Sequence, residues 1–245
     1  MTEPGPGPMR SPARRLRGAI AYKLGVAILS GEISPGELLS GGEVAAAEHL
    51  GVSRSAFREA VQVLTAKGLV ESRPRTGTRV LSRDRWNLLD PDVLAWAFAG
   101  EPDPRLLRSL FELRLVVEPA AAALAAKRRD KGDLLRIKDA LNGMRRHSLA
   151  TAEGQAADRD FHAALLRATG NEVIAAMSAS VGAAVTWTTR YKQRQRALPR
   201  DPVPDHARVH RAVADGDSAE AAAAMRLLVE LAVCDTPEVM TPADI

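Results

Sequence analysis

The sequence has little cysteine, few aromatic residues and no long apolar run, and each shortage excludes a class of protein. The one cysteine, Cys234, excludes an internal disulfide framework and a cysteine-based zinc finger, and it fits a reducing compartment. We expect Cys234 to fill space in the core. Lys23 interrupts "GAIAYKLGVAIL", so no segment approaches the roughly 18 apolar residues needed to cross a bilayer. These features predict a soluble, cytoplasmic protein without a membrane partner.

Aromatic residues make up only 4% of the 245 residues, whereas alanine-rich runs such as "EPAAAALAAKRR" are frequent. Alanine has the highest intrinsic helix propensity, so this composition favours helix over sheet. With 46% hydrophobic residues, the chain is long enough to bury a core in one large or two smaller domains. We therefore expect a mainly α fold in two domains.

Positive charge gathers in the first third of the chain. Residues 1–85 contain 13 Lys and Arg against 8 Asp and Glu, whereas residues 86–245 contain 21 against 22. A basic first part beside a neutral remainder indicates that one part binds a polyanion and the other has a different task.

The basic third begins with two expected helices. Residues 1–13 are rich in proline and glycine and predict a disordered tail. A helical pattern starts at Arg14 and ends in the glycines and proline of "SGEISPGELL". A second, short helix is expected over about residues 43–50, because Gly51 stops it.

The segment "GVSRSAFREAVQVLTAKGLV" predicts a third helix, capped by Ser53. Its apolar face consists of Phe57, Val61 and Leu64. Its first exposed turns carry Arg54, Ser55 and Arg58. Helix, glycine-containing turn and capped helix with arginines at its start form a helix-turn-helix, whose second helix enters the major groove by its N-terminal end.

The segments "LVESR" and "TRVLS" flank "PRTG" and predict a β-hairpin wing, with Arg75 and Arg79 near its tip. Arginine binds guanine edges bidentately or holds phosphates, and both tasks need the side chain outside the core. Each of these arginines, taken alone, is equally well explained as part of a solvated surface. The ordered set of helix, turn, helix and wing favours DNA binding.

Residues 14–82 closely resemble the N-terminal domain of the GntR family of bacterial transcription regulators, through "SGEISPGELL", "LGVSRSAFREAVQVL", "KGLVESRPRTGTRV" and their spacing. The resemblance implies a winged helix-turn-helix that binds a double-stranded DNA operator as a homodimer. It implies DNA contacts from Arg54, Ser55, Arg58, Arg75 and Gly77. The chain departs from the family where it has "LSGGE" in place of Leu-Pro-Ser-Glu, which leaves the start of the second helix open.

Residues 83–102 are expected to form a linker with a short helix after Asp90-Pro91, since proline suits the first turn of a helix. Six helical segments follow, separated by turns, and none alternates with period two. They span about 103–129, 132–149, 152–169, 171–195, 204–215 and 217–234. The second domain, residues 103–236, is therefore expected to be an all-α helical bundle, followed by a tail over residues 237–245.

Three pairs of polar side chains, each one turn apart, lie within the apolar stripes of this bundle. The pairs are Arg114 with Glu118, Asp158 with His162, and His206 with His210. Imidazole and carboxylate groups from two helices of a bundle suit Zn, Ni or Mn. The same residues also suit a local pair of Asp158 with Arg159, histidines on a wet face, and a surface ion pair of Arg114 with Glu118. Spacing alone does not choose between these alternatives.

Residues 103–234 resemble the all-helical effector domain of the FadR-type branch of the same family, the FCD domain. The resemblance rests on "ELRLVVEPAAAALAA", "DRDFHAALLRATGN" and "DHARVHRAVADGDSAEAAAAM". In metal-containing members the ligands are the aspartate and histidine of D-x-x-F-H and two later histidines, which implies Asp158, His162 and His206 here. The fourth ligand falls at Leu228, where the family has histidine, and His210 is a candidate substitute.

The resemblance therefore leaves two states of this site open. Three ligands still hold one divalent transition metal per subunit, Zn or Ni, when water or an effector oxygen completes the shell. The alternative is no metal. In both cases the implied effector contacts are Arg114, Asp158, His162 and His206.

The segments "RWNLLDPDVLAWAF" and "DPRLLRSLFELRLVVEP" further resemble regulators of sugar-acid catabolism, in particular D-galactonate-responsive repressors. This resemblance implies a small carboxylate effector such as a sugar acid, with Arg114 as a partner for the carboxylate. The main hypothesis is a repressor with no catalytic residues. Two alternatives remain: a metal-dependent hydrolase that uses the Asp/His cluster, and a constitutive DNA binder with a vestigial effector pocket.

Overall fold

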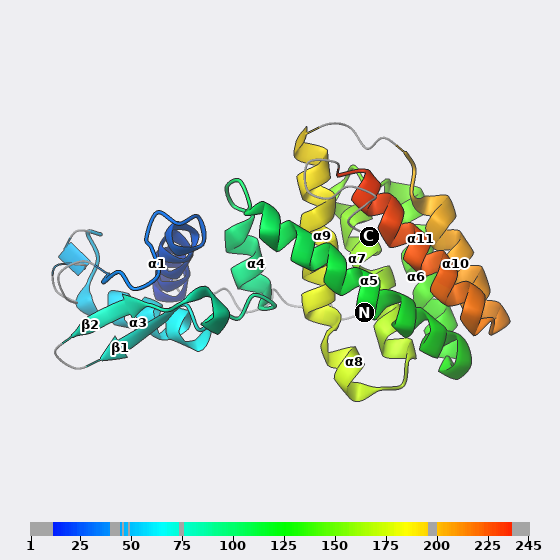
Figure 1. Cartoon of the computed structure of the whole chain (residues 1–245), viewed down its shortest axis with the longest axis horizontal. Coiled ribbons are helices and arrows are strands. Elements are labelled where there is room, and N and C mark those ends of the chain that lie inside the picture. The colour runs from blue at the N-terminus through cyan, green and yellow to red at the C-terminus, as the bar shows by residue number, and fades with distance from the viewer. Residues whose placement is uncertain are drawn as a thin grey trace, which may run out of the picture. The chain divides into compact units, whose positions relative to one another are not determined.

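The computed structural model describes residues 12–39, 45, 47, 48, 50–73, 76–195 and 200–236. It divides into two compact units, of which the first ends at Glu101 and the second begins at Pro102. The first unit combines helices with one β-hairpin, whereas the described part of the second is built from helices and their connections (Figure 1). The mainly α fold expected from the composition is confirmed.

The described part of the first unit contains the predicted first helix, the capped helix with arginines at its start, the wing and the helix after Asp90. Its elements are α1 (Pro12–Leu29), α3 (Arg54–Ala66), β1 (Val70–Arg73), β2 (Gly77–Val80), a 3-10 turn (Arg83–Arg85) and α4 (Pro91–Ala97). The expected short helix over residues 43–50, and the unusual "LSGGE" before it, fall largely outside the described residues.

Helix α3 begins where its cap residue places it. The Ser53 hydroxyl accepts a hydrogen bond from the backbone N–H of Ala56 at 3.2 Å, which satisfies one free donor of the first turn. The side chains of the predicted apolar face, Phe57, Val61 and Leu64, are buried in the core of the unit. The opposite face leaves Arg54, Ser55 and Arg58 exposed, as a DNA-reading helix requires.

The two strands form an antiparallel hairpin in which Val70 pairs with Val80 and Arg73 with Gly77. Gly77 has a φ of 89°, a left-handed conformation that favours glycine, at the point where the chain returns from the turn. The N–H of Leu39 also donates to the carbonyl of Thr78, so the segment before α3 extends the edge of the hairpin. Arg75, expected at the tip, lies outside the described residues.

Within the first unit, helix α4 packs on α1. Asp90 caps it, and the Lys67 ammonium, directly after α3, donates to Asp90 at 2.7 Å and to Asp92 at 2.9 Å. The same ammonium lies 5.4 Å from the centre of the Trp96 ring. The Trp96 ring also covers Gly25 of α1 so closely that a Cβ at this glycine would lie 2.2 Å from a ring carbon. Lys67 thus holds the start of α4 to the end of α3, and Trp96 packs the other end of α4 on the middle of α1.

We predict that Gly25→Ala destabilises the protein by about 1–3 kcal/mol, because the added methyl group overlaps the Trp96 ring. Gly18→Ala is the matched control in the same helix, since a Cβ there meets no atom within 4 Å. Alanine is the better helix former, so the control is expected to gain up to about 1 kcal/mol. Urea unfolding of both variants measures the difference, and equal stabilities would contradict the packing of α4 on α1.

The second unit is a helical bundle, as predicted. Its helices are α5 (Pro104–Arg128), α6 (Lys131–His147), α7 (Ala152–Ala168), α8 (Glu172–Ala176), α9 (Ser178–Gln195), α10 (Val203–Asp215) and α11 (Ser218–Cys234). Helix α5 contacts α7, α9, α10 and α11, so these four helices assemble on it, while α6 packs on α7 and α10 (Figure 1). None of the helices in the described part is long and apolar enough to span a membrane.

Two expectations for this unit are wrong. A single helix was expected over 171–195, but the chain forms two, α8 and α9, on either side of Met177. The Ser178 hydroxyl donates to the carbonyl of Ala175 at 2.6 Å, a local bond that competes with a continuous helix. Cys234 does not fill the core: it is exposed at the end of α11, and the neighbouring Val233 is buried instead.

Candidate functional site

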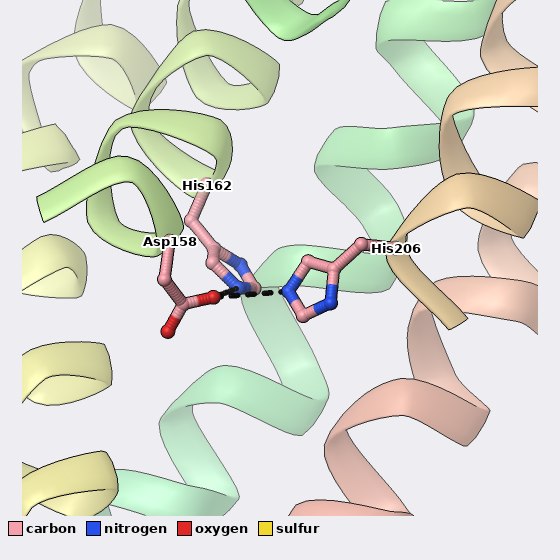
Figure 2. A group of neighbouring side chains, drawn as sticks. All are labelled: Asp158, His162 and His206. Atoms are coloured by element: carbon pink, nitrogen blue, oxygen red, sulfur yellow. Dashed lines mark ion pairs between the residues drawn. The ribbon is translucent and has the colours of Figure 1, made fainter. Parts of the chain in front are cut away.

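Helices α7 and α10 bring together the three residues expected to bind a metal. Asp158 and His162 lie one turn apart on α7, and His206 faces them from α10 (Figure 2). A carboxylate oxygen of Asp158 lies 3.0 Å from Nε2 of His206 and 3.6 Å from Nε2 of His162. All three side chains are buried, and one donor atom of each lies within 4.8 Å of the others. His206 therefore does not lie on a wet face.

Helix α5 completes the cluster with a buried ion pair. The Arg114 guanidinium donates through Nε to Oε1 of Glu118 at 2.7 Å, and through Nη1 to the Thr188 hydroxyl of α9 at 3.1 Å. The other oxygen of Glu118 lies 2.6 Å from Nδ1 of His162. The pair of Arg114 with Glu118 is therefore not a surface ion pair but a part of the polar cluster.

The contacts of both imidazoles direct their Nε2 atoms toward Asp158. Nδ1 of His206 lies 2.8 Å from the carbonyl oxygen of Pro202 and must donate to it, because a carbonyl only accepts. Nδ1 of His162 faces Glu118. Contacts of this kind at one ring nitrogen orient histidines that bind metals through the opposite nitrogen.

The donor set fits a divalent transition metal. Among the described residues, neither Asp158 Oδ1 nor His206 Nε2 has an aligned hydrogen-bond partner, although both atoms are buried. Buried polar atoms without partners are uncommon and costly, and a cation between them would satisfy both. Two imidazole nitrogens and one carboxylate oxygen are the ligands that Zn and Ni accept.

Charge coupling within the cluster shifts the pKa of its members. Burial alone would lower the pKa of His162, but the carboxylates of Glu118 and Asp158 outweigh it and raise this pKa to about 9. Burial alone would raise the pKa of Glu118, but Arg114 and His162 outweigh it and lower this pKa to about 2. The pKa of Asp158 is lowered too, since its two histidine partners outweigh its burial. The cluster is therefore ionised near neutral pH, and a metal at His162 would displace a proton.

Two other expectations about this site are corrected. His210 does not replace the missing fourth ligand: it lies near Lys138 and Arg145 of α6, and burial and these two cations lower its pKa. Asp158 does not pair with Arg159, which contacts Asp160 at 3.4 Å instead.

Sequence reasoning paired Glu118 only with Arg114 and did not find its contact with His162 or the role of Thr188. The spacing of Glu118 from Arg114 revealed one contact. The other contacts depend on how α7 and α9 are placed against α5, which leaves no local pattern.

The first unit presents a second functional surface. A groove of about 570 Å³ lies between α3 and the hairpin, and its lining includes Arg58 and Gln62 of α3 and Ser72 and Thr78 of the hairpin. Arg58 borders this groove from an exposed face of α3. The surface thus combines the predicted recognition helix with the wing.

Comparison with known proteins gives the same division of the chain. Residues 16–80 match the model of the bacterial regulatory proteins of the gntR family, and residues 109–231 match the FCD domain. The galactonate operon transcriptional repressor of Escherichia coli K12 is 35% identical over 210 residues, which cover 83% of this chain and 90% of the repressor. The chain belongs to the GntR family. It is a ligand-responsive, DNA-binding transcription regulator with an FCD domain.

Other relatives agree with this assignment. The HTH-type transcriptional regulator LutR of Bacillus subtilis 168 is 34% identical over 81% of this chain and 90% of its own length. Among solved structures, Lar of Listeria monocytogenes covers 96% of this chain and 100% of its own, with a TM-score of 0.66 and 17% identity. The second comparison shows the fold alone.

We predict that Glu118→Gln destabilises this GntR protein by about 3–5 kcal/mol, because it leaves the buried Arg114 charge uncompensated. The pKa of Glu118 is lowered to about 2, so its contribution is complete above the pKa of an unfolded glutamate, about 4.3, and is lost as the pH falls toward 2.

Glu220→Gln is the matched control, because Glu220 accepts from Nε of Arg208 at 2.6 Å in the same way but on the surface. An exposed pair contributes little, so we expect no measurable loss. Denaturant unfolding between pH 3 and pH 7 compares the two variants with the wild type. A Glu118→Gln protein as stable as the control at pH 7 would refute the central place of this carboxylate.

Proposed function

We propose that this GntR protein is a homodimeric, cytoplasmic repressor that a small carboxylate releases from a palindromic operator. In this proposal, residues 14–82 bind DNA, residues 83–102 link the domains, and residues 103–236 bind the effector. The buried cluster of Asp158 and His162 with its partners carries the proposal, because it places unsatisfied ligand atoms inside the FCD domain. The Escherichia coli and Bacillus subtilis relatives are transcription regulators, which supports a protein that is not an enzyme.

DNA reading is assigned to Arg54, Ser55 and Arg58 of α3 and to the wing near Gly77 and Arg75. The exposure of the three α3 side chains, of which Arg58 lines the groove, supports their part of this assignment. A two-fold symmetric dimer pairs with related half-sites, so the operator is expected to be a palindrome.

We predict that Arg58→Ala weakens operator binding by about 1–3 kcal/mol, the range expected for an arginine that reads a base. Binding by the wild type is expected to fall steeply with salt, since phosphate contacts release counterions. Arg146→Ala, an exposed arginine in the last turn of α6, is the control and leaves affinity unchanged. Gel-shift titrations measure the operator affinity of both variants. Wild-type affinity in Arg58→Ala would show that α3 does not read the major groove of the DNA as proposed.

The metal proposed for the cluster is one Zn or Ni ion per subunit, held by Asp158, His162 and His206. Leu228 is buried on α11 and offers no ligand atom, so water or an effector oxygen completes the shell. A metal bound there supplies positive charge at which a carboxylate or hydroxyl oxygen of the effector binds. Arg114 lies at the edge of the same cluster and keeps Glu118 and His162 in place for it.

We predict at most one transition metal per subunit, with a tighter site in Leu228→His, because histidine restores the fourth ligand of the family pattern. Leu227→His is the matched control, since Leu227 is exposed on the same helix and is not expected to change affinity. Elemental analysis after purification without chelator, and melting curves with added Zn or Ni, measure occupancy and affinity. If the purified protein contains no metal and neither ion changes its melting temperature, the cluster binds the effector without a metal.

The effector class is proposed to be a small acid that carries hydroxyl groups, such as a sugar acid. The name of the Escherichia coli relative supports this class. Galactonate is therefore the first compound to test: release of the operator complex by galactonate in the wild type, and its loss in Asp158→Ala, would support the proposal. Hydrolysis of simple phosphoesters or lactones that depends on added metal and on His162 would favour the hydrolase instead.

A further inference from the structure

Helix α9 contributes a lysine beside the cluster that the sequence did not single out. Thr188 accepts a hydrogen bond from Arg114, and Lys192 follows four residues later, so both lie on the same face of α9. The charges of Arg114 on α5 and Asp158 on α7 both act on the Lys192 ammonium. Lys192 is only partly buried, whereas Arg114 and Asp158 are buried. Lys192 therefore lies between the buried cluster and the solvent.

The other cations of this region already have partners. Arg114 is bound to Glu118 and Thr188, and Arg200 lies 3.2 Å from Asp235 and in contact with Asp205. Within the described part of the chain, no ion pair or hydrogen bond includes Lys192. Burial and the charge of Arg114 together lower the pKa of Lys192 to about 8, so an anion beside it would stabilise its charged form.

The charges of the region indicate how many negative charges an effector brings. The carboxylates are Glu118, Asp158, Asp205 and Asp235, and the cations are Arg114, Arg200 and Lys192 in its charged form. A divalent metal on neutral histidines leaves this group with one net positive charge. One carboxylate neutralises it, whereas a dicarboxylate would leave a buried negative charge in excess.

We propose that Lys192 is the residue that binds the effector's carboxylate, and that the effector is a hydroxy monocarboxylate with this carboxylate between Lys192 and the open coordination position. This inference rests on the effector site of the proposed function and names its specificity residue. Arg114, whose charge Glu118 already compensates, then holds the cluster rather than the ligand.

The test uses full-length protein loaded with Ni and calorimetric titration with galactonate, glycolate, lactate, malate and the neutral galactitol. We expect the wild type to bind at least one of the three monocarboxylates and neither malate nor galactitol. Lys192→Met is expected to weaken that monocarboxylate by about 10- to 100-fold, the range for a lost charged hydrogen bond. Lys192→Arg is expected to retain most of the affinity. Lys127→Met, an exposed lysine at the end of α5, is the control and leaves affinity unchanged.

Melting curves and Ni content of each variant separate binding from folding and metal loss. A Lys192→Met protein that keeps its Ni and binds the acid within twofold of the wild type overturns the role of Lys192 and leaves the proposed function standing. Loss of Ni or of the folded state in both Lys192 variants also overturns it, because Lys192 would then act on the cluster itself. Tighter binding of malate than of any monocarboxylate refutes the charge argument. A Ni-loaded wild type that binds none of the acids overturns the proposed function as well.

Discussion

One buried carboxylate, Glu118, holds the effector unit together. Its two oxygens contact Arg114 on its own helix and His162 on α7, and His162 and His206 both face Asp158. A buried carboxylate costs several kcal/mol unless cations compensate it closely. Helices α5, α7 and α10 are therefore fixed in the one register that keeps these groups together. The residues of the candidate site therefore also join three helices of the bundle.

This arrangement makes the bundle responsive to changes of charge. Replacement of the proton on His162 by a metal, or arrival of an anion next to Lys192, alters the charge balance of a cluster shared by four helices. A ligand shifts a conformational equilibrium only by its differential affinity for the two states, and such a cluster provides it. Six residues separate the end of α4 from the start of α5 at Pro104, and α4 is bound to the end of α3 through Lys67. In the proposed mechanism the chain itself thus connects the effector cluster to the recognition helix.

Local patterns in the sequence predicted most of the fold, because its elements are specified locally. The cap at Ser53, the apolar face through Phe57 and the proline after Asp90 each act within a few residues, and each is confirmed. The break at Met177 was missed because no proline or glycine announces it. The exposure of Cys234 was missed because it depends on how α11 packs on its neighbours.

The candidate site was predictable only in part for the same reason. Helical spacing identified Asp158 with His162 and His206 with His210, and family resemblance selected His206 as the third ligand. Spacing also suggested His210, which faces α6 instead. Thr188, the partner that arrives from α9, leaves no pattern in the sequence, because only the placement of α9 against α5 brings it to Arg114.

The leucine at position 228 gives the proposed site its particular character. A fourth histidine would close the metal shell with protein atoms, whereas three ligands leave a position for solvent or effector. When the effector completes the shell, effector and metal each strengthen the binding of the other, by the reciprocity of linked equilibria. A pocket without function has no need of Asp158, His162 and Glu118, whose burial costs free energy that apolar side chains of similar volume would not. The departure from the family pattern therefore fits a site in which weaker metal binding is exchanged for dependence on the effector.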